Sequence, residues 1–263
     1  MSEAPVFHDA IIKSILGSAR RSTLPYQKAH RGNDFGTAFW FNDLVDRQGD
    51  TETVRQYLVT AGAMTRYDIA EVRLRPELSE SAMSAHAIAM VRFEQEWTPL
   101  GDSGVAVMPT GGLHALARRK RWEWATDEIT DGLAARAEDV AAVEAEPVPA
   151  YVLGHDVGPD RTDRPQAVVV GDVVRGADDG RLWWNGTVPV GCGGAPVFVG
   201  VSLGDQRFKL VCLGVVLPAV DARHPVAAFD GIRSALRELP DPSSSTTPDT
   251  PASASGRWWR RAR

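Results

Sequence analysis

The chain has 263 residues, of which 43% are hydrophobic and 24% charged, and this composition is typical of a globular protein rather than of a disordered or fibrous one. Its net charge of −5 gives no general attraction for nucleic acid or an anionic membrane, and no apolar stretch is long enough to span a bilayer. Two cysteines cannot form a disulfide scaffold, and the acidic N-terminus does not resemble a signal peptide, so we expect a cytoplasmic protein. Arginine greatly outnumbers lysine, which favours a GC-rich bacterial source.

The first half of the chain is predicted to form one helix followed by short strands. Asp9 can cap a helix in which Ile11, Ile12, Ile15 and Leu16 recur at helical spacing. Short apolar runs then follow one another closely, as in an all-β barrel or sandwich. The predicted strands are 35–41, 57–61, 69–74, 87–93 and 105–108.

The second half begins with a predicted helix over 126–146, in which Ile129, Leu133, Val140 and Val143 share one face before Pro147 ends it. Further strands are predicted at 150–153, 166–174, 181–184, 195–201 and 208–217. A closing helix is predicted over 229–239 from its 3–4 spacing of apolar residues. Strands, a helix, more strands and a terminal helix together indicate a β architecture in two parts.

The C-terminal segment differs in composition from the rest of the chain. Residues 240–256 are rich in Pro, Ser and Thr and carry no large apolar side chain, so we expect them to be disordered. Residues 257–263 form a tip with the sequence Arg-Trp-Trp-Arg-Arg-Ala-Arg. Such a tip is either a solvated end or a contact for an acidic surface or partner.

Three segments carry recognisable motifs in this order: Phe35–Phe39, Tyr57–Ala63 and Val190–Phe198. They resemble, in turn, the Gly-Thr-Gly-Phe strand, the Leu-Val-Thr-Ala-x-His strand end and the Gly-x-Ser-Gly-Gly-Pro-Val loop of the trypsin-like peptidase family of bacteria. Supporting matches are Val105–Pro109, Tyr151–His155 and Leu213–Val216. The resemblance covers residues 34–239 and implies an all-β, chymotrypsin-like double β-barrel with an inter-barrel helix and a C-terminal helix. The implied parts are an N-terminal helical segment (1–34), a first barrel (35–125), a helical connector (126–146), a second barrel with its closing helix (147–239), and the tail (240–263).

The same resemblance implies that the catalytic groups are missing. The positions of the family's histidine, aspartate and serine fall on Ala63, Gly104 and Gly193. The backbone amides of Gly191 and Gly193 would still form the family's oxyanion pocket. The resemblance therefore predicts a pseudoprotease that binds a peptide or protein in the cleft between the barrels and needs no cofactor.

Two other interpretations keep catalysis possible. Asp102 lies two positions before Gly104 and supplies an aspartate if the loop is longer, although Gly-Asp-Ser-Gly is also a strong turn sequence. Cys192 resembles the nucleophile of viral cysteine proteases with this fold, although it equally fits a buried thiol, and the two cysteines are expected to stay unpaired. His86 lies in an apolar stretch and is a weaker candidate for a catalytic base. The histidines show no metal-ligand spacing, so we expect no metal.

A third interpretation is a structural or regulatory module that acts through its helices or its tail. The densest basic cluster within the folded part is Arg118–Trp124, where aromatic and basic residues alternate. Such a pattern can hold single-stranded nucleic acid, but neighbouring acidic residues dilute its charge. We interpret it as a connector leading out of the first barrel.

Overall fold

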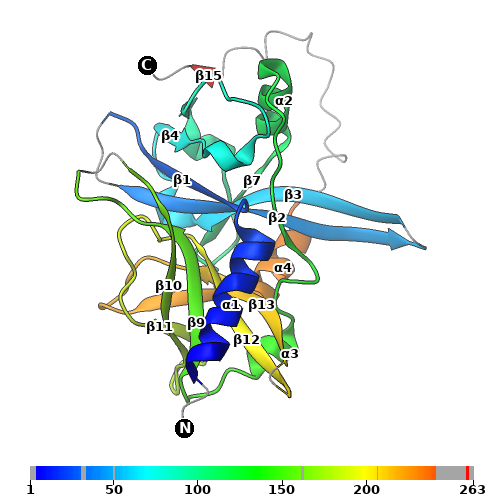
Figure 1. The fold of residues 1–263 in the computed structure, drawn as a ribbon, viewed down its shortest axis with the longest axis vertical. Helices are drawn as coiled ribbons and strands as arrows, with labels where there is room; N and C mark the ends of the chain where they lie inside the picture. Colours follow the sequence, from blue (N-terminus) through cyan, green and yellow to red (C-terminus); the bar gives the residue numbers. More distant parts are fainter. Residues whose placement is uncertain are drawn as a thin grey trace.

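The computed structural model describes residues 4–30, 34–49, 51–160, 163–205, 207–240 and 259–260, and its first part is a curled sheet (Figure 1). Its strands are β1 (Thr23–Lys28), β2 (Phe35–Gln48), β3 (Thr51–Ala61), β4 (Ile69–Arg73), β5 (Ala87–Val91), β6 (Thr98–Pro99), β7 (Val105–Pro109), β8 (Ile129–Thr130) and β15 (Trp259–Arg260). Among the described residues they pair in the order β15-β5-β4-β1-β2-β3-β7-β6, with β8 beside β2. The β2–β3 hairpin extends well beyond the body of the molecule.

The second part is a closed barrel of antiparallel strands. These are β9 (Val148–His155), β10 (Gln166–Arg175), β11 (Leu182–Asn185), β12 (Pro196–Gly204), β13 (Arg207–Val216) and β14 (His224–Ala228). They pair in the order β10-β11-β14-β13-β12-β9, and β9 returns to β10. The predicted two-part, all-β architecture is therefore confirmed.

Helices cover the ends and edges of the two barrels. They are α1 (Ala4–Ala19), α2 (Gly111–Lys120), α3 (Ala137–Ala141) and α4 (Phe229–Arg237), with short 3-10 helices η1 (Gly62–Met64), η2 (Pro76–Leu78) and η3 (Phe93–Glu96). The predicted helices at the two ends of residues 4–240 are confirmed as α1 and α4. None of the described helices is long and apolar enough to cross a bilayer.

Residues 126–146 do not form the single helix that their spacing predicts. Ile129 belongs to β8 and pairs in parallel with Phe41 of β2, and only the short α3 is helical. Farther along, the Ala135 amide donates to the Cys212 carbonyl of β13 at 2.8 Å. The segment is extended with turns and lies between the two barrels. Its apolar residues, three and four positions apart, are buried against one barrel or the other, and this spacing imitates that of a helix.

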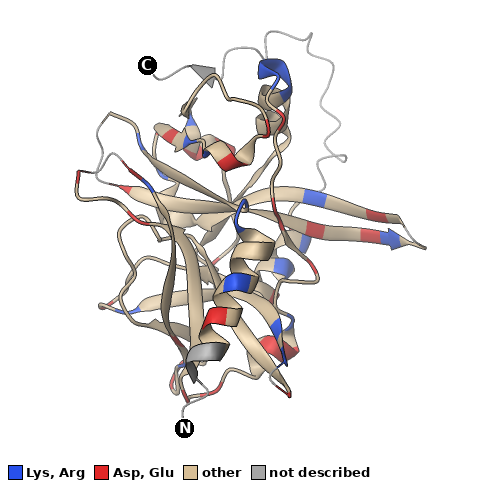
Figure 2. Ribbon diagram, in the orientation of Figure 1, with Lys and Arg blue, Asp and Glu red and all other residues tan. Residues whose placement is uncertain are grey.

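The sequence analysis missed the shortest elements and also three longer ones, β1, β14 and α2. β1 lies in the middle of the first sheet although it contains Pro25, a residue that is usually kept out of central strands because it has no N–H. β14 is a short strand without clear alternation. Helix α2 holds Arg118, Arg119 and Lys120 in its last turn, where cations suit the helix dipole, so the basic cluster is a helix end and not a simple connector (Figure 2).

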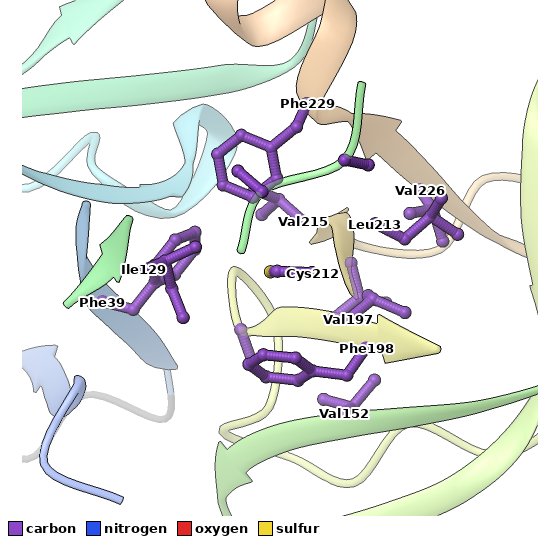
Figure 3. Packing of buried hydrophobic residues seen from close by; sticks show 14 of the residues in the cluster. Phe39, Ile129, Val152, Val197, Phe198, Cys212, Leu213, Val215, Val226 and Phe229 are labelled. Atoms are coloured by element: carbon purple, nitrogen blue, oxygen red, sulfur yellow. The ribbon is translucent and has the colours of Figure 1, made fainter. Parts of the chain in front are cut away.

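The buried hydrophobic residues form two clusters: one lies within the first part, and the other is a core that both barrels share. Along β2, Ala38 and Trp40 face the interior of the first sheet, whereas Phe39 and Phe41 face the second barrel. Phe41 packs on Phe229 of α4 with their ring centroids 5.0 Å apart. Figure 3 shows Phe39 and Phe229 beside side chains of the second barrel such as Val215. Because this core is continuous, the orientation of the barrels is fixed and a site between them is preorganised.

The segment predicted to be disordered, 240–256, lies outside the described residues from 241 onwards. Of the Arg/Trp tip, the structure describes only Trp259 and Arg260, whose backbone forms β15.

Candidate functional site

The loop before β12 carries the predicted oxyanion glycines and is held in one conformation. Gly191 and Gly194 have φ of +99° and +84°, which favour glycine. A β-carbon at Gly191 would collide with the carbonyl oxygen of His155, and one at Gly194 would collide with the hydroxyl of Thr60. Both glycines are therefore required by the fold around them.

Thr37 of β2 connects this loop to the first barrel. Its amide donates to the Gly193 carbonyl at 2.9 Å, and its hydroxyl donates to the Gly191 carbonyl at 2.7 Å. The same hydroxyl accepts from the His155 amide at 3.1 Å. From the second barrel, the Val216 carbonyl accepts from the Gly194 amide at 2.8 Å. The Gly191 and Gly193 carbonyls thus accept hydrogen bonds from the first barrel and join the loop to it.

The amides of Gly191 and Gly193 behave differently from these carbonyls. Within the described part of the chain, neither amide donates a hydrogen bond. Gly191 is buried and Gly193 is half-buried. Unpaired amides in a glycine loop are what an oxyanion pocket needs, so the two predicted residues keep their donors available.

The two positions that the resemblance assigns to a histidine and an aspartate, Ala63 and Gly104, lie next to each other. Ala63 is in η1, directly after β3, and Gly104 precedes β7; both are exposed. The Gly62 amide donates to the Gly104 carbonyl at 2.8 Å, which ties the two segments together. The fold therefore brings these two positions together as the resemblance implies, but without an ionisable side chain at either one.

Two apolar side chains lie where catalytic groups would need room. A β-carbon at Gly193 would lie 2.7 Å from the Met64 sulfur, and a β-carbon at Gly104 would lie 2.9 Å from Cδ1 of Leu217. Gly104 also has φ of +75°, so a substituted residue would be strained there. Neither Met64 nor Leu217 was singled out from the sequence.

A cavity of about 450 Å³ lies between the barrels at Ala63 and Gly104. Its lining residues from the first part are Gly62, Ala63, Thr65, Arg66, Glu94, Trp97, Pro99, Gly101, Gly104 and Val105, and those from the second part are Leu217, Pro218, Ala219, Val220 and Pro225. One cation and one anion are included, and most of the other side chains are apolar. Among the lining residues, Val220 is 54% exposed and offers an accessible apolar side chain.

Both cysteines are buried and free. Cys192 packs against β9, since a β-carbon at Gly154 would lie 2.7 Å from its sulfur. Burial, with a smaller contribution from Asp156, raises the pKa of the Cys192 thiol to about 12. Burial also raises the pKa of Cys212. Nucleophilic cysteines need the opposite shift, towards the thiolate.

The other catalytic candidates lie away from the cavity lining. Asp102 is exposed in the turn between Gly101 and Gly104, which matches the turn interpretation of this sequence. His86 is exposed just before β5 and does not line the cavity. No cluster of three or more metal-ligating side chains occurs in the ranges that the structure describes.

A buried histidine that the sequence analysis did not select joins the barrels. His155 Nδ1 donates to the Arg164 carbonyl at 3.1 Å, because a carbonyl can only accept, and Nε2 then accepts from the Thr23 hydroxyl at 2.9 Å. Thr23 also accepts from the Gln166 amide at 2.8 Å. Burial, and then the charge of Arg75, lower the pKa of His155 from 6.5 to about 4. The neutral ring is thus a structural link between the two barrels.

Comparison with known proteins supports the fold. No family model and no curated protein sequence matches the chain. A serine endoprotease from Yersinia pestis is similar over 86% of this chain, with 8% identity and a TM-score of 0.50, and the chain spans 66% of the length of that protein. Two further similar structures are a thermostable serine protease from an extremophilic microorganism (10% identity, 82% of this chain and 94% of that one, TM-score 0.48) and a catalytically inactive tobacco etch virus protease complexed with substrate (8% identity, 85% of each chain, TM-score 0.47). At this identity the similarity to the Yersinia pestis protein shows the fold alone: the chain is a chymotrypsin-like double β-barrel.

Proposed function

We propose that the protein binds an extended peptide segment of a partner protein in the inter-barrel cavity and does not hydrolyse peptide bonds. The observation that carries this proposal is the state of the three triad-equivalent positions, Ala63, Gly104 and Gly193. None has a side chain that can attack a carbonyl or move a proton, and yet the cavity of about 450 Å³ remains open beside the first two.

The expected loss of catalysis is large. Removing one triad serine or histidine lowers turnover by roughly 10⁶-fold, about as much as removing the whole triad. The buried Cys192, with its raised pKa, does not offer a substitute nucleophile. Gly191 and Gly193 do not line the cavity, so their two amides would serve as donors only to a part of the ligand that extends beyond it.

The cavity favours recognition through a side chain. Both backbone hydrogen-bonding groups of Leu217 already have partners. Its amide donates to the Pro225 carbonyl at 2.9 Å, and its carbonyl accepts from the His224 ring at 3.0 Å. Pro218 has no N–H to offer. A peptide therefore gains little from strand pairing at this segment. An apolar side chain, in contrast, can enter among Trp97, Leu217 and Val220.

The absence of hydrolysis is tested by incubating the purified protein with a proteome-derived peptide mixture and analysing the products by mass spectrometry, with Cys192→Ala in parallel. We expect no new cleavage at high protein concentration and long times. Cleavages made by the unsubstituted protein alone would identify Cys192 as a nucleophile and overturn the proposal. Cleavages made by both proteins would also overturn it, once a mock purification had excluded a contaminating protease.

Binding is tested by selecting peptides from a displayed random library and measuring their dissociation constants by fluorescence anisotropy. Ala63→Trp fills the cavity and is expected to weaken binding at least about tenfold. The matched control is Ala142→Trp, which places the same side chain at an exposed position outside the cavity lining. Equal affinities for the two variants would show that the selected peptides bind elsewhere and would refute the proposed site.

The rival interpretation is an interaction module that acts through the C-terminal tail. A truncated chain that ends at residue 240 distinguishes it from binding in the cavity. If the cavity is the binding site, this shorter chain binds the selected peptides with unchanged affinity. Loss of binding on truncation would instead assign the activity to the C-terminal tip.

A further inference from the structure

The first sheet ends in a strand whose outer edge has unusual properties. Strand β5, with the sequence Ala-Ile-Ala-Met-Val, pairs with β4 on one side, and among the described residues only the two-residue β15 pairs with its other side. Ile88 and Met90 are 4% and 2% exposed and face the core, while the alternate residues are partly exposed. The strand contains no charge and no proline, which are the residues that usually protect such an edge. An edge of this kind is a template for pairing with another strand.

A distant part of the same chain lies on this edge. The backbone of Trp259 pairs antiparallel with Met90, and that of Arg260 pairs with Ala89 (Figure 1). The chain leaves the first sheet after β8, builds the whole second barrel and α4, and returns to the sheet only at β15. The 18 residues from 241 to 258 separate the two described segments and can span at most about 60 Å.

We propose that the edge of β5 is a strand-addition site, and that the C-terminal tip of the chain, residues 257–263, is its tethered occupant in cis. Strand addition uses backbone hydrogen bonds, so it suits an edge that offers backbone groups and small outward side chains. The tip carries two consecutive tryptophans, which favour strand conformation. This site is separate from the inter-barrel cavity and does not depend on the proposed function.

The chain that connects α4 to the tip acts as a tether, which raises the occupancy of this short strand pairing while leaving it reversible. The structure describes two residues of the tip, both paired with β5, and a free peptide held by the backbone hydrogen bonds of two residues would bind weakly. Tethering converts binding into an intramolecular step with an effective concentration in the mM range. An untethered extended peptide should therefore reach the edge readily when the tip is removed, and poorly when it is present.

The first experiment compares amide hydrogen exchange in the full chain and in a chain ending at residue 240. We expect exchange in Ala87–Val91 to accelerate about tenfold or more on truncation, because the edge amides lose their partners. Exchange in β12 and β13 should not change, which controls for a general loss of stability. Equal exchange of β5 in both chains would overturn the proposal. In the full chain the protection should also be independent of concentration, and its loss on dilution would show that the tip binds a second copy rather than its own β5.

Two paired variants of the full chain distinguish backbone pairing from side-chain attachment. Replacing Trp259 and Arg260 together by proline removes both backbone donors and should expose β5 as truncation does. Replacing the same two residues by threonine keeps the donors and strand propensity, so it should keep the protection. Loss of protection in the threonine variant would refute strand addition as the means of attachment.

A synthetic peptide with the sequence of residues 256–263 tests whether the edge accepts a strand in trans. Added to the truncated chain at mM concentration, it should restore the protection of β5, while the same peptide with proline at the positions of Trp259 and Arg260 should not. Failure of the first peptide to restore protection would overturn the assignment of β5 as a strand-addition site.

Discussion

Protonation of His155 should make the protein sensitive to mild acid, and this link between the barrels can be tested directly. The ring is completely buried, with Nδ1 bonded to the Arg164 carbonyl and Nε2 to the Thr23 hydroxyl. A second proton would have to sit on Nε2. It would be buried near the guanidinium of Arg75, whose charge already opposes it. The substitution to compare is His155→Gln, which removes the titrating group.

The magnitude follows from the difference between the folded and unfolded pKa values. The pKa of His155 is lowered from 6.5 to about 4, so the unfolded chain binds more protons than the native protein in this pH range. Stability is therefore greatest above pH 6.5 and is lost as the pH falls towards 4. At about 1.4 kcal/mol per unit of pKa, His155 alone lowers the free energy of unfolding by about 3 kcal/mol between pH 7 and pH 4.

The assay is urea unfolding followed by tryptophan fluorescence at several pH values from 7 to 4, with the free energy of unfolding extrapolated to zero denaturant. The His155→Gln variant is less stable than the unsubstituted protein at pH 7, because it loses the bond to Arg164. Its stability should nevertheless fall by about 3 kcal/mol less on acidification. The control is His86→Gln, at an exposed histidine. Parallel pH profiles for the unsubstituted protein and His155→Gln would refute the reasoning.

Two other predictions concern the glycines of the site. The triple variant Ala63→His, Gly104→Asp and Gly193→Ser should give no cleavage in the peptide-mixture assay. The reason is that Met64 lies beside position 193 and Leu217 beside position 104, where the new side chains need space. Measurable turnover would contradict this prediction. Gly194→Ala should destabilise the protein by about 3 kcal/mol or more, since its φ is +84° and its β-carbon would collide with the first barrel. The comparison is Gly17→Ala, in the last turn of α1, where no atom lies within 4 Å of the added carbon; it should stabilise the protein by up to about 1 kcal/mol. Urea unfolding measures both variants, and an unchanged stability of Gly194→Ala would show that the loop is not held as described.

The strands that could be predicted from the sequence are those that show a clear run of apolar residues. β2 and β3 carry long apolar stretches because both of their faces are covered, and such stretches are readable without tertiary information. β1 was missed because Pro25 argues against a central strand, and the segment containing Ile129 was misread because apolar spacing of three and four also arises in an extended chain between two barrels. In both cases tertiary contacts override the local signal.

The features of the candidate site divide in the same way, into those with a local signal in the sequence and those set by tertiary contacts. Of the two predicted glycines, Gly191 has the positive φ that a tight loop needs, which is a local requirement, whereas Gly193 does not, and Gly194 was not predicted as a site residue although its φ is positive. Met64 and Leu217 were not identifiable, because nothing in the sequence says which apolar side chain will cover Gly193 or Gly104. The His155 network was also invisible, since two of its members, Thr23 and Gln166, are 143 positions apart.

The glycine loop has a structural role that does not require catalysis. Thr37 binds the carbonyls of Gly191 and Gly193, and the Gly194 amide binds the second barrel, so the loop helps to join the two barrels. Each of these bonds is made by the backbone of the loop and is independent of a serine at position 193. The scaffold therefore depends on the backbone of the loop and not on a catalytic side chain, whereas a side chain at Gly191 or Gly194 would collide with its surroundings. The presence of a protease-like loop is thus explained by the stability of the double barrel, and only the unpaired amides remain to be explained by a ligand.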